Sequence, residues 1–138
     1  AALGAELLVR HLGDLMARQL QARAQDESRA TYAAKISRDD ARIDWRRQAV
    51  ELDRHVRAFN PVPGAFFTLD ANAIKCWRAE VVPGVQAEPG KVVAAGKTGV
   101  IVACGTDGLR LTRLQRPGRP PVTGGEFAAQ LDLTGRTL

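Results

Sequence analysis

The sequence predicts a mainly β fold with flanking helices: a five-stranded OB-like β-barrel preceded by an amphipathic helix and a linker. Apolar residues recur with helical spacing between residues 5 and 23. From Ala65 onward, short β-prone runs alternate with glycine, proline and aspartate turns. A chain of 138 residues, 45% hydrophobic, can build one modest core. Five short, closely spaced strands are typical of a small barrel, and the OB-fold is the commonest five-stranded form.

The N-terminal segment has the spacing of an amphipathic helix over residues 5–23. Its apolar stripe consists of Leu7, Leu8, His11, Leu12, Leu15, Met16 and Leu20. Leaving such a stripe in water forgoes about 1.5 to 3 kcal/mol for each large side chain. We therefore expect the helix to pack on the chain's own barrel or on a second copy of itself.

The next segment is polar and lacks a regular period, so it is predicted to be a linker. The resulting domain division is a helix over residues 1–24, a linker over 25–43 and a barrel domain over 44–138. No internal repeat or low-complexity tract interrupts it.

A second helix is predicted after Asp44, whose carboxylate suits an N-cap. Its buried face is predicted to carry Ala49, Leu52, Val56 and Phe59. Asn60-Pro61 should end it, because proline disfavours helical geometry in the preceding residue.

The barrel domain contains five predicted strands and a short final helix. The strands are residues 66–69, 74–82, 91–95, 100–104 and 109–114. The run Thr123-Gly-Gly-Glu126 matches a capping box, so a C-terminal helix should begin there.

Composition, charge and cysteine spacing indicate which partners, metal sites and compartment to expect. The net charge of +5 is compatible with a polyanionic partner. Cys76 and Cys104 lack metal-ligand spacing, which favours a reduced, buried pair over a disulfide or zinc site. Neither a signal peptide nor an apolar run of membrane-spanning length is recognisable, so the cytoplasm is the expected compartment and no membrane partner is expected.

No catalytic or metal-ligating residue is predicted. The run from Gly90 to Thr98 places five residues between its glycines where a P-loop needs four, so a hairpin turn is favoured. His11 lies on the apolar stripe, and His55 follows Glu51 by four residues, which suggests a helix-surface pair. The acids Asp39-Asp40 suit the start of a helical turn.

The strongest chemical signal is basic. Arg110, Arg113, Arg116 and Arg119 follow one another without an intervening acid, and Lys75 and Arg78 lie on an earlier predicted strand. Such residues can track a phosphate backbone along one barrel face. A solvated, charged strand edge explains the same spacing equally well.

Two segments carry a family resemblance: Ala41-Arg-Ile-Asp-Trp45, and Arg57-Ala-Phe-Asn-Pro-Val-Pro-Gly64. In order and spacing they resemble the linker and C-terminal domain of the methionyl-tRNA formyltransferase family. The family's catalytic Asn, His, Asp set and its Ser-Leu-Leu-Pro motif cannot be found here.

The resemblance implies an RNA-binding role without catalysis. The intact enzyme would move a formyl group from 10-formyltetrahydrofolate to initiator methionyl-tRNA, and the catalytic N-terminal domain would be a further partner. No cofactor is implied for this chain by itself. Lys35 and Arg38 match basic linker positions of the family, and Arg42 joins them as a predicted tRNA contact.

Two alternatives stay open. Formyltransferases that act on nucleotide sugars, and folate-handling formyl hydrolases or dehydrogenases, share a similar entry to the barrel. The second alternative is a free-standing interaction module that associates with itself through its N-terminal helix and binds RNA only weakly.

Overall fold

The computed structural model describes residues 2–138. The chain divides into two compact units, one ending at Ala34 and one extending from Lys35 to Leu138. Each unit is described by itself.

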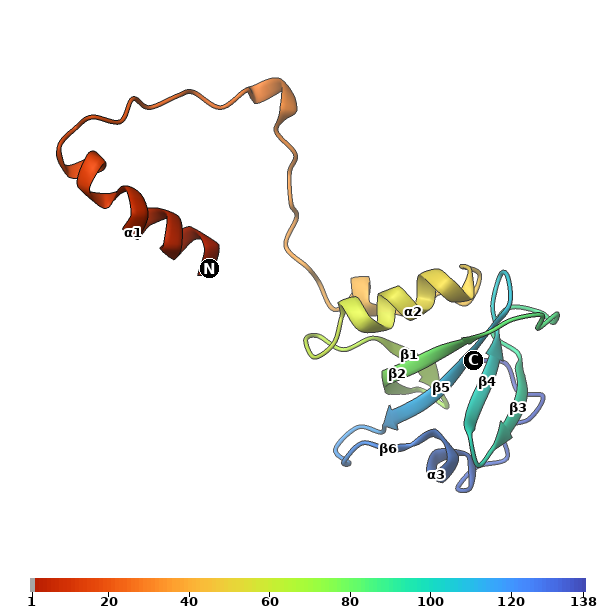
Figure 1. Ribbon diagram of the computed structural model, residues 1–138. Helices are drawn as coiled ribbons and strands as arrows, with labels where there is room; N and C mark the ends of the chain where they lie inside the picture. Colours follow the sequence, from red (N-terminus) through yellow and green to blue (C-terminus); the bar gives the residue numbers. More distant parts are fainter. Residues whose placement is uncertain (1) are drawn as a thin grey trace. The chain divides into compact units, whose positions relative to one another are not determined.

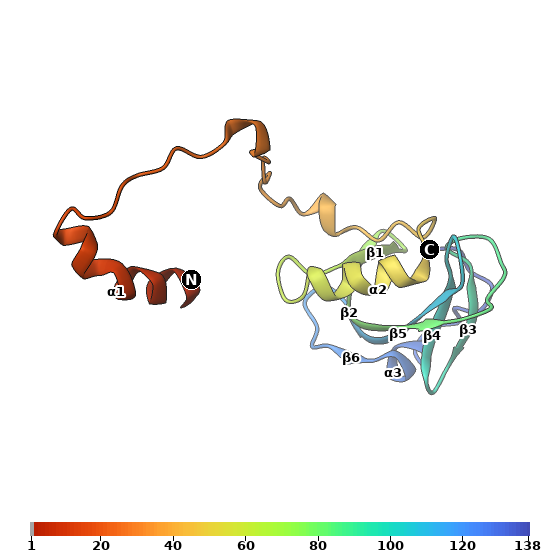
Figure 2. The ribbon, with the colours of Figure 1, turned by 45° about the horizontal axis from the view of Figure 1, so that its top comes forward.

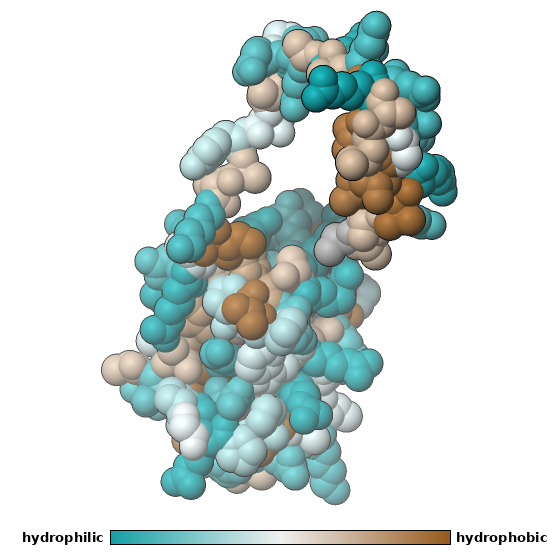
Figure 3. All heavy atoms as spheres, turned by 90° about the vertical axis from the view of Figure 1, so that its left-hand side faces the viewer, coloured by the Kyte–Doolittle hydropathy of each residue, from teal (hydrophilic) through white to brown (hydrophobic). Residues whose placement is uncertain are grey.

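The first unit contains helix α1 (Ala2–Met16) and the short 3-10 helix η1 (Glu27–Arg29). The predicted end of α1 near residue 23 is wrong, because the chain turns at Arg18, whose φ is +54°. Leu20 therefore lies outside the helix. The apolar side chains of α1 are exposed, and Figure 3 shows them gathered as a brown patch on one face.

The second unit is built on an antiparallel sheet (Figure 1). Its strands are β1 (Phe66–Leu69), β2 (Asn72–Val82), β3 (Val92–Gly96), β4 (Gly99–Ala103), β5 (Gly108–Gln115) and β6 (Val122–Thr123). The order is β1-β2-β5-β4-β3, with β6 paired to β5. The sheet forms a half-barrel with flanking helices, which confirms the predicted mainly β class and its five strands. The two-residue β6 was missed because it is too short to show a period.

The C-terminal segment covers the outer edge of β3. The amide of Val92 donates to the carbonyl of Arg136 at 2.8 Å, and the amide of Gly135 donates to the carbonyl of Val92 at 2.8 Å. The guanidinium of Arg136 also pairs with the carboxylate of Asp70 in the β1–β2 turn. This segment thus joins the two ends of the sheet and protects an edge that could otherwise pair with another chain.

Helices α2 (Ala49–Ala58) and α3 (Gly124–Ala128) close the core from opposite sides (Figures 1 and 2). The predicted buried face of α2 is confirmed, since Ala49, Leu52 and Val56 are buried and Phe59 packs against the core. The predicted capping box is also present: Thr123 Oγ1 accepts from the amide of Glu126 at 3.1 Å, and the Glu126 carboxylate accepts from the amide of Thr123 at 2.8 Å.

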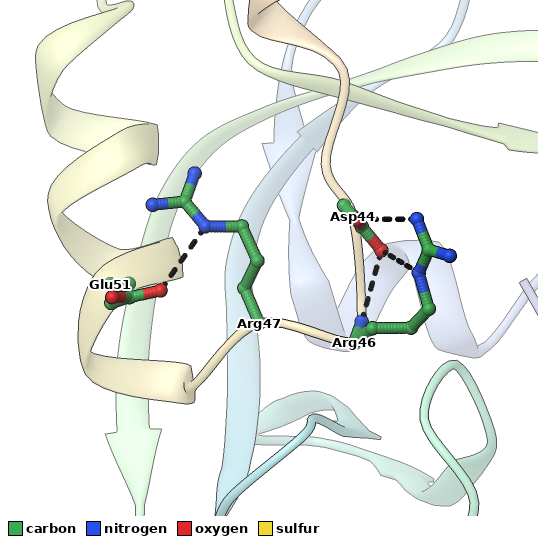
Figure 4. A network of polar contacts seen from close by, with 4 residues as sticks. All are labelled: Asp44, Arg46, Arg47 and Glu51. Carbon is green, nitrogen blue, oxygen red and sulfur yellow. Dashed lines mark hydrogen bonds and ion pairs between the residues drawn. The ribbon is translucent and has the colours of Figure 1, made fainter.

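Asp44 does not cap α2, so that prediction is wrong (Figure 4). The helix begins five residues later because the amide of Ala49 donates to the carbonyl of Thr106 at 3.0 Å, which holds the preceding segment beside the β4–β5 loop. The Asp44 carboxylate instead accepts from the guanidinium of Arg46, with two contacts of 2.8 Å, and from the Arg46 amide at 3.1 Å.

The predicted pair between Glu51 and His55 is also wrong. Glu51 accepts from Nε of Arg47 at 3.1 Å, and Arg47 lies four residues earlier, in the segment before α2 (Figure 4). The His55 ring packs against Phe59 with ring centroids 4.6 Å apart, and burial lowers the pKa of His55. His55 is therefore a packed side chain in this fold.

Both cysteines are free and buried, as predicted. Burial raises the pKa of Cys76 to about 12 and that of Cys104 to about 11. Each thiol stays protonated near neutral pH, which removes its nucleophilic form. Within residues 2–138, no helix has both the length and the apolar character needed to span a membrane.

Candidate functional site

One surface feature of the folded unit is an open cleft of about 500 Å³, which we call the outer cleft. It is lined by Arg38, Pro63, Gly64, Phe66, Ala73, Lys75, Gln115, Pro117 and Gly118. The strand register determines which residues form the floor of the cleft. Phe66 on β1 opposes Lys75 on β2, and Lys75 opposes Gln115 on β5, so these three residues form a row across the sheet.

Alternation along β2 directs Lys75 and Trp77 away from the core, while Ile74 and Cys76 are buried. The ammonium of Lys75 lies 5.1 Å from the centre of the Trp77 ring. A cation over an indole face at this distance is attracted by the ring's negative quadrupole. The contact positions Lys75 while leaving its N–H donors available to a ligand.

Two arginines sit over the neighbouring aromatic ring. The guanidinium carbons of Arg38 and Arg42 lie 5.5 Å and 4.9 Å from the centre of the Phe66 ring. The backbone brings them there, because the amide of Ile43 donates to the carbonyl of Phe66 at 2.8 Å and so attaches this segment to β1. Arg38 and Lys75 therefore line one cleft, while Arg42 contacts the Phe66 ring.

Gln115 holds the far wall of the cleft. Its Oε1 accepts from the Trp77 indole at 2.8 Å, and its Nε2 donates to the carbonyl of Arg119 at 2.7 Å. The loop after β5 is thus attached to β2 through one side chain. On the opposite wall Gly64 has a φ of +90°, and a Cβ there would lie 3.0 Å from the Trp77 ring.

The outer cleft is electrostatically one-sided. No carboxylate occurs among the residues that line it. Arg38 and Lys75 have no ion-pair partner within 4 Å in the described part of the chain, whereas Arg42 has a long, exposed contact of 3.9 Å to Asp39. Two uncompensated cations at one concave surface suit an anionic ligand.

The arginines of β5 and its following loop occupy distinct environments. Arg110 forms an ion pair of 3.8 Å with Glu80. Arg116 lies over the Phe127 ring at 5.1 Å, with its Nη2 buried and unpartnered within residues 2–138. Arg119 is exposed, and its backbone carbonyl is engaged by Gln115.

Arg78 and Arg113 are partners in the β2–β5 register, and both side chains are exposed. Lys35 is also exposed, at the start of the second unit. The nine predicted residues therefore form several groups. Arg38 and Lys75 line the outer cleft, and Arg42 lies over the Phe66 ring. Arg116 and Arg119 lie on the next loop, Arg78 is the register partner of Arg113, and Arg110 pairs with Glu80.

Sequence reasoning missed Trp77, Gln115 and Gly64. The alternation Lys75-Cys76-Trp77 could have placed the indole on the lysine face. Nothing in the sequence signals that Gln115 opposes Lys75, because that contact joins residues from distant parts of the chain.

The glycine-lysine run and the acids Asp39-Asp40, interpreted as structural from the sequence, form a turn and a local hydrogen-bonded cap. Gly96 opposes Gly99 in the β3–β4 hairpin, which confirms the turn predicted in place of a P-loop. Asp40 accepts from the amide and hydroxyl of Ser37 at 2.7 and 2.9 Å, and these bonds lower the pKa of Asp40. No group of three or more potential metal ligands from His, Cys, Asp and Glu occurs among residues 2–138.

In a comparison with known families, the model described as "Formyl transferase, C-terminal domain" matches residues 35–132. Curated relatives are named methionyl-tRNA formyltransferase. The one from Pseudomonas putida is 47% identical over 118 residues, which is 86% of this chain and 38% of that protein. The one from Methylococcus capsulatus is 42% identical over 139 residues, which is 100% of this chain and 45% of that protein. The chain thus spans less than half the length of these relatives.

Among solved structures, the chain is similar to HypX from Aquifex aeolicus. A HypX variant superposes with a TM-score of 0.66 at 15% identity, over 96% of this chain and 24% of HypX. HypX in complex with tetrahydrofolic acid superposes with a TM-score of 0.63 at 16% identity, over 91% of this chain and 22% of HypX. At such identities the likeness concerns the fold.

Proposed function

The chain belongs to the formyl transferase C-terminal domain family, and from that membership we propose that its folded unit binds tRNA on behalf of a methionyl-tRNA formyltransferase. In the intact enzyme the formyl group of 10-formyltetrahydrofolate would pass to the amino group of initiator methionyl-tRNA. The unit's contribution is to hold the tRNA so that its aminoacyl end reaches a catalytic domain, which is catalysis by positioning.

The observation that carries this proposal is the outer cleft, where Arg38 and Lys75 converge without a lining carboxylate. Each cation rests on an aromatic ring and not on an acid. Phosphates of a nucleic acid are the ligands such groups meet best, since guanidinium and ammonium N–H donors pair with phosphate oxygens. We infer that this nucleic acid is tRNA because the curated relatives are named methionyl-tRNA formyltransferase.

The cleft favours backbone contacts over the reading of single bases. Phe66 is buried under Arg38 and Arg42, and Trp77 is half-buried beneath Lys75, so neither ring offers a free face to a base. Structured RNA is recognised mainly through shape and phosphate contacts. Initiator and elongator tRNAs should therefore bind this unit alike.

Binding across a salt series tests the proposal. The wild-type chain should bind tRNA in the range of about 10⁻⁴ to 10⁻⁶ M at physiological salt, as non-specific complexes do. Lys75→Gln and Arg38→Gln should each weaken binding and flatten the plot of log affinity against log salt by about one unit or less. Arg54→Gln, on the exposed side of α2, is the matched control and should leave the slope unchanged. Salt-independent binding by the wild type would remove the proposal.

A second test concerns catalysis. The chain alone, incubated with 10-formyltetrahydrofolate and methionyl-tRNA, should form no formylmethionyl-tRNA, while a full-length methionyl-tRNA formyltransferase forms it under the same conditions. Product formation by the chain alone would contradict the assignment of a binding role.

A further inference from the structure

Side chains at the end of β5 alternate between the two sides of the sheet. Leu114 is buried, and the next residue, Gln115, lines the outer cleft. Arg116 then lies on the side of α3, with its guanidinium carbon 5.1 Å from the centre of the Phe127 ring. Alternation thus places Arg116 on the opposite side of β5 from the Gln115 side chain.

A tight turn brings Arg119 beside Arg116. The amide of Arg119 donates to the carbonyl of Arg116 at 3.2 Å, and between them lie Pro117 and Gly118, whose φ is +68°. Proline followed by a residue with positive φ is typical of a type II β-turn, whose first and last Cα atoms lie within about 7 Å of each other. Gln115 holds this turn through its bond of 2.7 Å to the carbonyl of Arg119. Two guanidinium groups therefore start from neighbouring points of one fixed turn.

An open pocket of about 370 Å³ lies against these two arginines, and we call it the inner pocket. It is lined by Arg116, Arg119, Pro120, Val122, Phe127 and Gln130. The inner pocket and the outer cleft have no lining residue in common. They are therefore two separate concave surfaces of the folded unit.

The arginines of the inner pocket have no acid beside them. No carboxylate lines the pocket, and neither guanidinium lies within 4 Å of a carboxylate among residues 2–138. Asp70, in an adjacent hollow that both arginines also line, pairs with Arg136. Nη2 of Arg116 is buried without a hydrogen-bond partner in the same range. An unpartnered buried donor destabilises the free protein, so a bound acceptor would relieve that cost.

We propose that the inner pocket binds a small organic carboxylate whose body is apolar. This inference goes beyond the proposed function, because it concerns another ligand and no residue of the outer cleft. The carboxylate would accept from Arg116 and Arg119, since a guanidinium pairs with a planar carboxylate through two parallel hydrogen bonds. The apolar body would cover Pro120 and Val122, neither of which is buried in the free protein.

The apolar wall distinguishes this ligand from a phosphate group. Small-molecule sites combine apolar walls with a few polar groups that fix the orientation of the ligand. A phosphate would leave Pro120 and Val122 in contact with water, whereas an apolar body removes them from it. An uncharged ligand with the same body would leave the Arg116 guanidinium without an acceptor. Both parts of the ligand should therefore contribute to binding.

Titration with benzoate, followed by the amide NMR signals of the full chain, tests the proposal. Benzoate should shift the amides of Phe127 and Gln130 in a saturable way and leave those of Lys75 and Trp77 in place. Acetate, inorganic phosphate and benzyl alcohol each lack either the apolar body or the carboxylate. Each should bind at least roughly tenfold more weakly than benzoate.

Three variants show which side chains hold the acid. Arg116→Gln and Arg119→Gln should each weaken benzoate binding by roughly tenfold, because each loses charge-assisted hydrogen bonds. Arg119 is exposed, so Arg119→Gln keeps the test informative even where loss of the Arg116–Phe127 contact unfolds the other variant. Arg54→Gln on α2 removes the same charge elsewhere and should leave benzoate affinity unchanged.

Several results would overturn the carboxylate site. They are an Arg119→Gln protein with wild-type affinity for benzoate, phosphate that binds as tightly as benzoate, and benzoate shifts confined to Lys75 and Trp77. A titration without any saturable shift would overturn it as well. None of these results bears on tRNA binding, which rests on Arg38 and Lys75 and has its own test in the salt series.

Discussion

The indole Nε1 of Trp77 donates to Oε1 of Gln115 at 2.8 Å, which joins residues 38 positions apart. Through the second bond of Gln115, to the carbonyl of Arg119 at 2.7 Å, the same amide holds the loop after β5. The shape of the outer cleft therefore depends on a side chain that carries no charge.

Gln115→Ala should destabilise the folded unit by about 1 to 3 kcal/mol, since two hydrogen bonds are lost at about 0.5 to 1.5 kcal/mol each. Urea unfolding measures this change. Faster hydrogen exchange across residues 116–119 should accompany it, because the loop loses its attachment to β2. Gln130→Ala is the matched control, since Gln130 is exposed and its side chain makes no hydrogen bond within the described chain. Equal stabilities for the two variants would contradict the role given to Gln115.

Gly124→Ala should destabilise the unit by about 1 to 3 kcal/mol through overpacking. A Cβ at Gly124 would lie 2.1 Å from the carbonyl oxygen of Leu111 and 2.9 Å from Cα of Gly99, so α3 would have to move away from the sheet. Gly96→Ala is the control, because a Cβ there meets nothing within 4 Å. Thermal or urea unfolding distinguishes them, and a Gly124→Ala protein as stable as Gly96→Ala would show that α3 does not pack as described.

Asp44 should make stability depend on pH in the acid range (Figure 4). Hydrogen bonds from the Arg46 side chain, then from its amide, lower the pKa of Asp44 from its usual 3.8 to about 2. Because the folded-state pKa is depressed, the stabilisation is fully present above the usual pKa of 3.8 and is lost as pH falls through about 2.

The Asp44→Asn variant provides the measurement. At near-neutral pH it should unfold at a lower urea concentration than the wild type, and the difference should shrink as pH falls toward about 2, where the Asp44 carboxylate becomes neutral. A difference that stays constant across this range would mean that the Asp44 carboxylate contributes nothing through its charge.

The apolar stripe of α1 should drive self-association of the chain. Leu8, Leu12 and Leu15 are each about half exposed, and burying them against a second copy would recover roughly 1.5 to 3 kcal/mol per side chain. Sedimentation velocity should show a concentration-dependent assembly that Leu12→Glu, or removal of residues 1–24, converts to monomer. Arg10→Glu, a polar position on the same helix, should leave assembly intact. A monomeric full chain at all concentrations would disprove this role for α1.

The sequence by itself determined most of the local structure. Proline and glycine positions, helical spacing and the Thr123–Glu126 capping box decided where α2 ends, where β1 to β5 lie and where α3 begins, because each depends on residues close together in the chain. The predictions at Asp44 and Glu51 failed partly for a shared reason, and at Asp44 also because the Ala49–Thr106 backbone bond delays the start of α2. Side-chain partners compete, and the neighbouring arginines Arg46 and Arg47 took both carboxylates.

Tertiary structure decided the candidate site. The sequence predicted nine basic residues as tRNA contacts but could not show that Arg110 is paired with Glu80, that Arg78 opposes Arg113, or that Arg38 and Lys75 share one cleft. Strand register sets those relationships, and it depends on pairing between segments that are distant in sequence. Composition and spacing therefore predicted the net charge and the type of most elements. Which charged residues lie together depends on the strand pairing in the folded sheet, so the sequence alone did not predict it.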